Sequence, residues 1–368
     1  MRSERTFGLA VAGGGTGGHI FPGLAVAREF RRREPGARVL YLGAAGRLEE
    51  RVVPREGPAV RFHGLRVSGL KGQGPRGALR ALVLAARAVG ECRREIAAFG
   101  ADVLLGTGGY SSGPAAVAAR TLGVPVVLQE QNAVPGLTNR LLGRLARRVF
   151  IAFEPARRYF PEGRVVLAGN PVRDEALGAA AEVGCGPGLR VLVLGGSQGA
   201  RGVNRLVAGA LPALAAAGLA VSFVHQSGEA ERERVAAAYR GAGLTAEVAA
   251  FFDAMGERYG AADLVIARAG AGTIAEIAAN GRPAILVPFP HAAGDHQRIN
   301  ARWLADRGGA LIIEEHAPDA PGELARAIVA LAGDRERLRA LARASAAVGV
   351  RDAAARIVDE CRRMLGRV

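Results

Sequence analysis

A short apolar run that ends in a glycine-rich loop and continues as a helical stretch occurs three times in this chain, in both of its halves. The runs and their loops are residues 7–12 with 13–18, 191–194 with 195–199, and 264–266 with 268–273. Glycine at the end of a strand lets backbone N–H groups approach a ligand, and the positive end of the next helix attracts anions. The pattern therefore predicts two halves that each bind a phosphate-bearing ligand, with the two ligands meeting across a cleft.

The other apolar runs alternate with amphipathic helical stretches along the chain. Most are continuous runs of Val, Leu and Ile, which is typical of strands buried on both faces of a parallel sheet. Pro and Gly cluster at 170–188, between two sets of runs, and the strand-free stretch at 335–365 has to pack back onto the rest. The sequence predicts an α/β protein with two doubly wound parallel-sheet domains of similar size. The expected strands are 7–12, 39–42, 103–105, 126–128, 149–151 and 165–167, then 191–194, 221–224, 246–249, 264–266, 284–287 and 311–313.

The net charge of +15 comes almost entirely from arginine, since Lys71 is the only lysine. It fits either a generally basic surface or attraction to polyanions such as phosphorylated substrates and anionic membranes. Aromatic residues make up only 5% and no nucleic-acid-binding motif occurs, so nucleic acid is not an expected partner. The three cysteines are widely separated, and no run approaches the roughly 20 apolar residues of a membrane span. We therefore expect a cytosolic protein without a disulfide framework.

No cofactor or metal is expected from the motifs. The loop at 13–18 satisfies G-x-G-x-x-G, but the strand at 39–42 is not followed by the acidic residue that holds a ribose in dinucleotide-binding folds. No Gly-Lys-Ser/Thr follows any loop, which excludes an ATP-hydrolysing phosphate loop. His291 and His296 lack a helical metal spacing, and no Asp-x-Asp occurs.

Polar residues follow several of the expected strands. His19 stands at the junction of the first loop and helix, where an imidazole is either a general base or a helix cap. The loops at 107–114 and 130–132 either bind sugar hydroxyls or make turns. Glu276 falls one turn into a helix, where its carboxylate either favours the helix dipole or accepts both hydroxyls of a ribose. Gln297 and Asn300, three residues apart, share one helix face.

Taken in order, these motifs closely resemble one family over essentially the whole chain. They are Gly-Gly-Thr-Gly-Gly-His at 14–19, Glu-Gln-Asn at 130–132, Asn-Pro-Val-Arg at 170–173, Gly-Gly-Ser-Gln-Gly-Ala at 195–200 and Arg-x-Gly-Ala-x-Thr-x-x-Glu at 268–276. The sequence resembles the MurG family, UDP-N-acetylglucosamine–N-acetylmuramyl-(pentapeptide) pyrophosphoryl-undecaprenol N-acetylglucosamine transferases. The resemblance implies the GT-B fold, with two Rossmann-like domains and an interdomain cleft. It implies an acceptor domain at 1–168, a UDP-GlcNAc domain at 169–347 and a C-terminal helix at 348–368 that returns to the first domain.

The resemblance also implies roles for individual residues. His19 is the candidate base. Substrate contacts are implied for Thr16, Gly17, Gly18, Asn132, Arg173, Ser197, Phe252, Met255, Arg268, Gly272, Thr273, Glu276, Gln297 and Asn300, and acceptor contacts for Gly14, Gly15, Tyr110 and Glu130. Within these sets, Glu276 is placed at the ribose, Phe252 and Met255 at the uracil, and Gln297 and Asn300 at the GlcNAc hydroxyls. Ser197, Gly272 and Thr273 are placed at the UDP diphosphate, residues 14–18 at the acceptor's diphosphate, and Asn132 and Arg173 near the transferred sugar. Ala269, where a serine is common, and Phe252, where a β-branched residue is expected, depart from the family pattern.

The implied reaction is inverting transfer of GlcNAc from UDP to the C4 hydroxyl of MurNAc in undecaprenyl-linked lipid I, which forms lipid II. The resemblance also implies a peripheral location at the cytoplasmic face of the cell membrane, with cell-wall synthesis proteins as further partners. The basic, apolar stretch at 65–84 is the expected membrane surface, against the alternative that its apolar residues are core. Two rival functions are another GT-B enzyme acting on UDP-GlcNAc, such as an epimerase, and a nucleotide-binding regulatory module.

Overall fold

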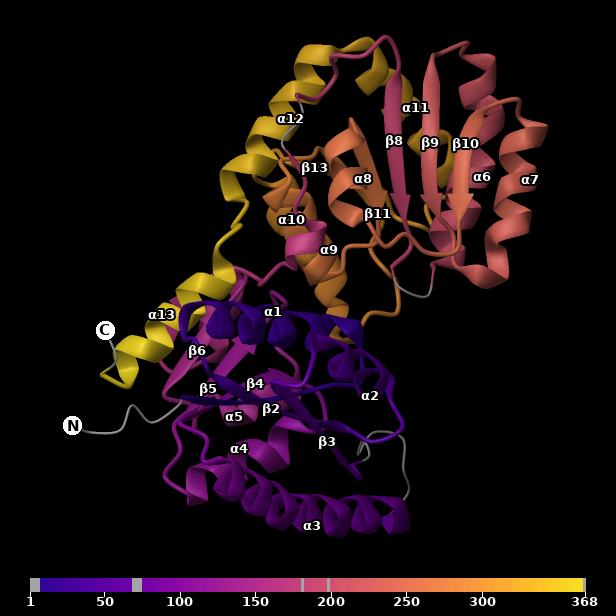
Figure 1. Cartoon of the computed structure of the whole chain (residues 1–368). Coiled ribbons are helices and arrows are strands. Elements are labelled where there is room, and N and C mark those ends of the chain that lie inside the picture. Colours follow the sequence, from indigo (N-terminus) through magenta and orange to yellow (C-terminus); the bar gives the residue numbers. More distant parts are fainter. Residues whose placement is uncertain (1–6, 68–74, 180–181, 197–198, 367–368) are drawn as a thin grey trace. The chain divides into compact units, whose positions relative to one another are not determined.

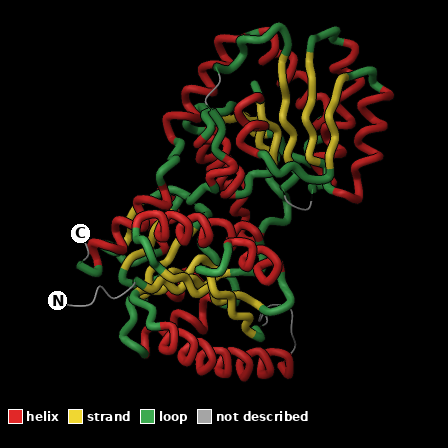
Figure 2. Tube along the Cα trace, in the orientation of Figure 1, coloured by secondary structure: helices red, strands yellow, loops and turns green. Residues whose placement is uncertain are grey.

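The computed structural model describes residues 7–67, 75–179, 182–196 and 199–366. By its internal contacts the chain divides into two units, Met1–Pro171 with Asp352–Val368, and Val172–Arg351. Each unit is built on one parallel sheet with helices on both of its faces (Figure 1, Figure 2). The predicted α/β class with two doubly wound parallel sheets is therefore confirmed.

The sheet of the first unit has seven strands in the order β3-β2-β1-β4-β5-β6-β7, all parallel. The strands are β1 (Gly8–Gly13), β2 (Arg38–Ala44), β3 (Val60–Leu65), β4 (Val103–Gly108), β5 (Val126–Glu130), β6 (Arg148–Ile151) and β7 (Val165–Leu167). Sequence patterning does not predict β3, because Arg61 and His63 interrupt the apolar Val60, Phe62 and Leu65 of this edge strand, which is therefore not a continuous apolar run. An edge strand needs less burial than the central strands, so its signal is weaker.

Two apolar layers cover the faces of this first sheet. Successive residues of β1 point to opposite faces, so that Leu9 and Val11 belong to one core cluster and Ala10 and Ala12 to the other. The helices of the unit are α1 (Gly17–Arg33), α2 (Leu48–Val52), α3 (Pro75–Phe99), α4 (Ser112–Thr121), α5 (Leu137–Leu142) and α13 (Ala353–Met364). Helices α1 and α13 pack on one face, and α3, α4 and α5 on the other (Figure 1).

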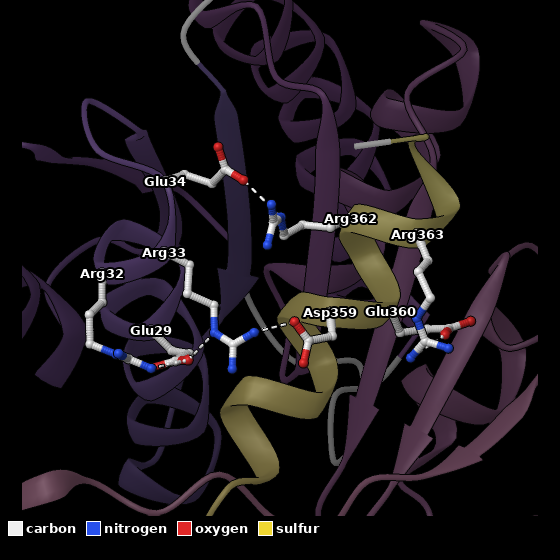
Figure 3. A network of polar contacts seen from close by, with 8 residues as sticks. All are labelled: Glu29, Arg32, Arg33, Glu34, Asp359, Glu360, Arg362 and Arg363. Carbon is white, nitrogen blue, oxygen red and sulfur yellow. Dashed lines mark hydrogen bonds and ion pairs between the residues drawn. The ribbon is translucent and has the colours of Figure 1, made fainter. Parts of the chain in front are cut away.

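The C-terminal helix α13 joins the first unit through an apolar stripe and a set of ion pairs. Ile357, Val358 and Cys361 are buried in the core cluster that α1 shares. Figure 3 shows the charges that flank this contact, in which Arg33 of α1 binds Asp359, and Arg362 binds Glu34 at 2.8 Å. Because these charged side chains are partly exposed, the buried stripe is the main source of stability in this contact.

The sheet of the second unit has six parallel strands in the order β10-β9-β8-β11-β12-β13. The strands are β8 (Leu189–Leu194), β9 (Val221–Gln226), β10 (Thr245–Ala249), β11 (Leu264–Ala267), β12 (Ala284–Leu286) and β13 (Ala310–Ile312). The helices are α6 (Arg201–Ala216), α7 (Arg232–Gly241), α8 (Met255–Ala261), α9 (Ala271–Ala279), α10 (His296–Ala305), α11 (Ala320–Gly333) and α12 (Arg335–Val348). Every strand predicted in this half is present.

Both sheets reverse their strand order at one point, between β1 and β4 in the first unit and between β8 and β11 in the second. In open parallel sheets, ligands bind outside the carboxyl ends of the strands at such a switch point. All three glycine loops, and the loop after β4, leave the sheets there. Within the described ranges, no helix is both long and apolar enough to cross a membrane.

Candidate functional site

In the first unit, the glycine loop joins β1 to α1 at the switch point. The backbone amide of Gly14 donates to the carbonyl oxygen of Gly108 (3.3 Å), and that of Gly15 donates to the buried carboxylate of Glu49 (3.1 Å). Two amides expected at the acceptor's diphosphate are therefore engaged inside the protein. The cap and first turn of α1, where backbone amides have no intrahelical acceptor, are formed by Thr16, Gly17 and Gly18.

His19 lies half-buried in the first turn of α1. Its Nδ1 is 3.2 Å from the carbonyl oxygen of Gly14 and 3.3 Å from Oγ1 of Thr16. Because a carbonyl oxygen only accepts, Nδ1 carries the proton in that contact, and the basic lone pair is on Nε2. A Cβ at Gly108, whose φ is +101°, would lie 3.0 Å from Nε2. The glycine thus makes room for the imidazole at the carboxyl end of β4, in the tautomer that a general base needs.

Glu130 is fully buried at the end of β5. Its carboxylate accepts hydrogen bonds from the amide of Asn132 and from Nδ2 of Asn139, both at 2.9 Å. Burial nevertheless raises the pKa of Glu130 to about 7. Asn139 also lies near His19, since a Cβ at Gly108 would be 3.6 Å from its Nδ2. Asn139 thus connects Glu130, whose pKa lies near neutral pH, with the loop that carries Gly108 beside the imidazole. Tyr110 lies exposed in the loop after β4.

The second unit holds a cavity of about 560 Å³ at the carboxyl ends of its strands. Its lining includes glycines of the loop after β8, Arg201 and Arg205 of α6, Arg268 and Thr273 after β11, and Gln297 of α10. Backbone amides and guanidinium groups suit an anionic ligand, and α9 begins here with Gly272 and Thr273 in its first turn. Ser197, expected at the diphosphate, lies outside the described residues.

Arg268 is held rigidly in the wall of this cavity. Its Nη1 donates to the carbonyl oxygens of Val287 and Pro288, both at 3.2 Å, and its Nη2 lies 2.5 Å from a carboxylate oxygen of Glu315. The guanidinium also stacks over the ring of Phe289, 5.4 Å from the centroid. These contacts fix the position of the guanidinium beside the glycine loop, where Glu315 balances its charge.

Gln297 and Asn300 occupy different environments, although the helical spacing puts them on one face. Gln297 lines the cavity, and its Oε1 accepts from the amide of Phe289 at 2.9 Å. Asn300 is fully buried and donates from Nδ2 to the carbonyl oxygen of Ala269 at 3.3 Å. In this structure, Asn300 supports the loop after β11.

Glu276 lies in the second turn of α9, close to a tyrosine hydroxyl and an arginine guanidinium. The hydroxyl of Tyr259 donates to its Oε2 at 3.0 Å, and Nη2 of Arg173 is 3.9 Å from its Oε1. Burial raises the pKa of Glu276, and Arg173 and Tyr259 oppose that shift. Arg173, expected beside the transferred sugar, thus lies with the residue expected at the ribose.

Phe252 and Met255 are both buried after β10. Gln226 ties this segment to the loop after β8, because its Oε1 accepts from the amide of Phe252 and its Nε2 donates to the carbonyl oxygen of Gly196, each at 3.0 Å. The guanidinium of Arg258 covers one face of the Phe252 ring at 4.5 Å. Among the described residues, no group of three or more His, Cys, Asp or Glu could hold a metal ion.

Two family models match the two halves of the chain. Residues 9–151 match the glycosyltransferase family 28 N-terminal domain, and residues 190–357 match the C-terminal domain. A relative from Geobacter sulfurreducens is 42% identical over 96% of this chain and 97% of its own length, and one from Myxococcus xanthus is 43% identical over 96% and 92%. Both are named UDP-N-acetylglucosamine–N-acetylmuramyl-(pentapeptide) pyrophosphoryl-undecaprenol N-acetylglucosamine transferase. The crystal structure of Acinetobacter baumannii MurG is 32% identical, with a TM-score of 0.79 over 98% of this chain and all of its own.

The chain belongs to the MurG family. Its GT-B fold is shared more widely, since a UDP-GlcNAc 2-epimerase from Neisseria meningitidis bound to UDP-GlcNAc superposes with a TM-score of 0.67 at 13% identity. At that identity the likeness shows the fold alone.

Four residues of this MurG-family site are not among the predicted ones. They are Glu49, Asn139, Tyr259 and Glu315. Each contacts a predicted residue, and Glu315 also lines the cavity of the second unit. Of the four, only Glu49 could have been noticed in the sequence, because it is an acidic residue in the first turn of a short helix, where it interacts favourably with the helix dipole. The others become visible only when the sheet brings distant segments together.

Proposed function

We propose that this protein transfers GlcNAc from UDP-GlcNAc to the C4 hydroxyl of MurNAc in undecaprenyl-diphosphate-linked MurNAc-pentapeptide, lipid I, with inversion at the anomeric carbon. The observation that carries the proposal is the match over nearly the full length to relatives named for this reaction. The two switch-point sites support it, since each unit has a loop suited to a phosphate-bearing ligand.

The second unit holds the donor in this proposal. Glu276 accepts hydrogen bonds from the ribose hydroxyls, and the diphosphate lies at the start of α9, against Gly272 and Thr273 and beside Arg268. As the bond from the anomeric carbon to the diphosphate breaks, negative charge grows on the leaving UDP. Backbone amides and the α9 dipole stabilise that charge without rearrangement. Arg268, held by Glu315 and two carbonyl oxygens, supports the wall of the cavity beside them.

The first unit supplies the base. Nε2 of His19 takes the proton from the C4 hydroxyl while the hydroxyl oxygen attacks the anomeric carbon. Nδ1, hydrogen-bonded to Gly14, keeps the imidazole oriented, and the amides of residues 16–18 meet the acceptor's diphosphate. Glu130 is the second candidate base, because its pKa of about 7 also suits proton transfer.

Radiolabelled UDP-GlcNAc with a lipid I analogue tests the function. We expect label in the lipid product, with one UDP released per GlcNAc transferred. Transfer to a soluble acceptor, or epimerised sugar nucleotide, would identify the rival GT-B enzyme. Tight UDP-GlcNAc binding with no turnover in the presence of the acceptor would identify a regulatory module.

We also propose that the protein works at the cytoplasmic face of the cell membrane, bound peripherally through its first unit. The stretch at 65–84 supports this only weakly: Leu65 is fully buried, which contradicts its place on a surface, and the side chains of 68–82 lie outside the described residues. A better-supported surface is on and after α5, where Leu137, Leu141 and Leu145 are 66%, 57% and 42% exposed, beside the exposed Arg140 and Arg144. Apolar side chains among arginines suit an anionic lipid surface.

Flotation with vesicles containing anionic lipid tests this surface. We expect binding that salt weakens and that the double variant Leu137→Glu with Leu141→Glu abolishes. The matched control is Leu167→Glu, another exposed leucine of the same unit, on β7. Unchanged binding in the double variant would move the membrane surface elsewhere.

A further inference from the structure

Tyr259 is a buried side chain whose polar atom serves one residue of the donor site. It is completely inaccessible to solvent on α8, and its hydroxyl donates to Oε2 of Glu276 at 3.0 Å. Burial, and then the Glu276 carboxylate, raise the pKa of Tyr259 well above its ordinary value. The hydroxyl therefore keeps its proton at all physiological pH values and stays a donor.

The backbone around α8 leaves Tyr259 little freedom. A Cβ at Gly256 would lie 2.8 Å from the carbonyl oxygen of Leu177, so α8 packs directly against the backbone of the segment that follows Arg173. Asn280, just after α9, bonds the same segment, accepting from the amide of Gly178 at 2.8 Å and donating to the carbonyl oxygen of Ala176 at 2.8 Å. Arg173, Tyr259 and Glu276 thus sit on three elements that are tied to one another.

This arrangement has a consequence for Glu276. One carboxylate oxygen is fixed by Tyr259 and the other faces Arg173, so the orientation of the carboxylate is restrained before a ligand arrives. A carboxylate has about four acceptor positions, so one bond from Tyr259 leaves room for two hydroxyl donors. A free glutamate side chain would instead lose rotamer freedom on binding.

We infer that Tyr259 is a positioning residue that makes the site selective for ribonucleotides, because it holds Glu276 in the orientation that accepts the 2′ and 3′ hydroxyls together. The inference rests on the proposed donor site. Beyond that site, the inference states that selectivity for ribose over 2′-deoxyribose depends on the hydroxyl of Tyr259, which does not itself contact the nucleotide. A purely structural Tyr259 would affect stability but not this selectivity.

The experiment is calorimetry with UDP and 2′-deoxy-UDP on the wild type, Tyr259→Phe and Tyr239→Phe. Tyr239 is the matched control, since it is a buried tyrosine of the same unit whose hydroxyl bonds one partner, His225, at 3.1 Å. We expect the wild type to prefer UDP by about 10-fold, the effect of one hydrogen bond to a charged group. In Tyr259→Phe the preference should fall below about 3-fold, mainly through weaker UDP binding, while Tyr239→Phe keeps the wild-type ratio.

The pH dependence gives a second reading on the same proteins. Glu276 must be ionised to accept both hydroxyls, so UDP affinity falls as the pH is lowered through the pKa of Glu276. The Tyr259 bond lowers that pKa, so its loss should move the fall in UDP affinity to higher pH. 2′-Deoxy-UDP should show a smaller pH effect.

Two outcomes separate the inference from the function it rests on. If the wild type binds UDP and 2′-deoxy-UDP equally, Glu276 is not at a ribose and the proposed donor site is wrong. If the wild type discriminates and folded Tyr259→Phe keeps the same ratio and pH midpoint, the donor site stands and the inference fails.

If Tyr259→Phe does not fold, carbon-13 NMR of the tyrosine Cζ resonances of the wild type replaces the calorimetry of this variant. Tyr41→Phe and Tyr239→Phe assign the third buried resonance by elimination. UDP should shift it more than 2′-deoxy-UDP does, and equal shifts would overturn the inference.

Discussion

At the scale of single residues, the site consists of polar groups whose orientations are set by hydrogen bonds to neighbouring side chains and loops. His19, Glu130 and Glu276 were identifiable from motifs. His19 and Glu276 follow β1 and β11, which flank the switch points, and Glu130 ends β5, the neighbour of β4. Their partners were not identifiable, since Asn139 and Tyr259 reach them only through tertiary packing. The same packing shows that Gly14 and Gly15 use their amides internally, which a glycine motif alone does not reveal.

His19→Ala should lower turnover by about 10²–10⁴-fold, the usual contribution of a general base. UDP affinity should not change, because the proposed nucleotide contacts belong to the other unit. Steady-state kinetics with a lipid I analogue, beside calorimetry with UDP, measure the two effects. Near-normal turnover would reassign the base to Glu130.

Glu130 should make stability pH-dependent. Its pKa is about 7 in the folded protein against an ordinary 4.5, so between these values the folded state holds a proton that the unfolded state has released. The free energy of unfolding should therefore decrease as the pH rises from about 4.5 to about 7, by on the order of 3 kcal/mol, and then level off. Urea denaturation of the wild type and Glu130→Gln across this range measures the difference, which should be greatest at and above pH 7. A difference that does not vary with pH would show that Glu130 is ionised throughout.

At the scale of elements, continuous apolar runs in the sequence identified the central strands. The edge strand β3 was not identified, because polar residues interrupt its apolar ones. These are Arg61 and His63, which pair with Glu95 and Glu91 of α3, and β3 has a strand neighbour, β2, on one side only. The sequence indicates that the C-terminal stretch is helical, but it does not indicate which face of which sheet the helix covers. An amphipathic helix can cover any apolar face, and only the buried contacts of Ile357 and Val358 identify the α1 side of the first sheet.

The attachment of α13 should depend on its apolar stripe more than on its ion pairs. Ile357→Ala should reduce the free energy of unfolding by about 2–5 kcal/mol, because it removes a fully buried side chain. Arg362→Ala, which loses the partly exposed pair with Glu34, should cost less than about 1 kcal/mol. Equilibrium denaturation at low and high salt gives both values. A larger loss for Arg362→Ala, itself reduced by salt, would make the ion pairs the principal attachment.

At the scale of the whole molecule, the chain has a net charge of +15 and two switch-point sites suited to phosphate-bearing ligands. Composition alone did not show what that charge attracts, because the number of arginines is the same whether they are spread over the surface or gathered at a site for polyanions. The family match resolves the class of reaction, since the relatives share nearly the full length of both units. In the stretch at 65–84, whose pattern predicts a surface, Leu65 is core, and the prediction for the side chains of 68–82 is not tested because they lie outside the described residues.

Glu276→Ala should raise the dissociation constant of UDP by roughly 10–100-fold, because it removes a charged acceptor of two hydroxyl groups. Calorimetry and a thermal melt of the free protein separate this from a structural role. A lower melting temperature with unchanged UDP affinity would make Glu276 a structural residue and would contradict the donor site.

The central claim is inverting transfer of GlcNAc to the C4 hydroxyl of MurNAc, and proton NMR of the product tests it most directly. UDP-GlcNAc carries the sugar in the α configuration, so a single displacement predicts a β-linked GlcNAc on C4 of the MurNAc in the lipid I analogue. An α-linked product, a linkage to another hydroxyl, or free or epimerised sugar in place of a disaccharide would contradict the account.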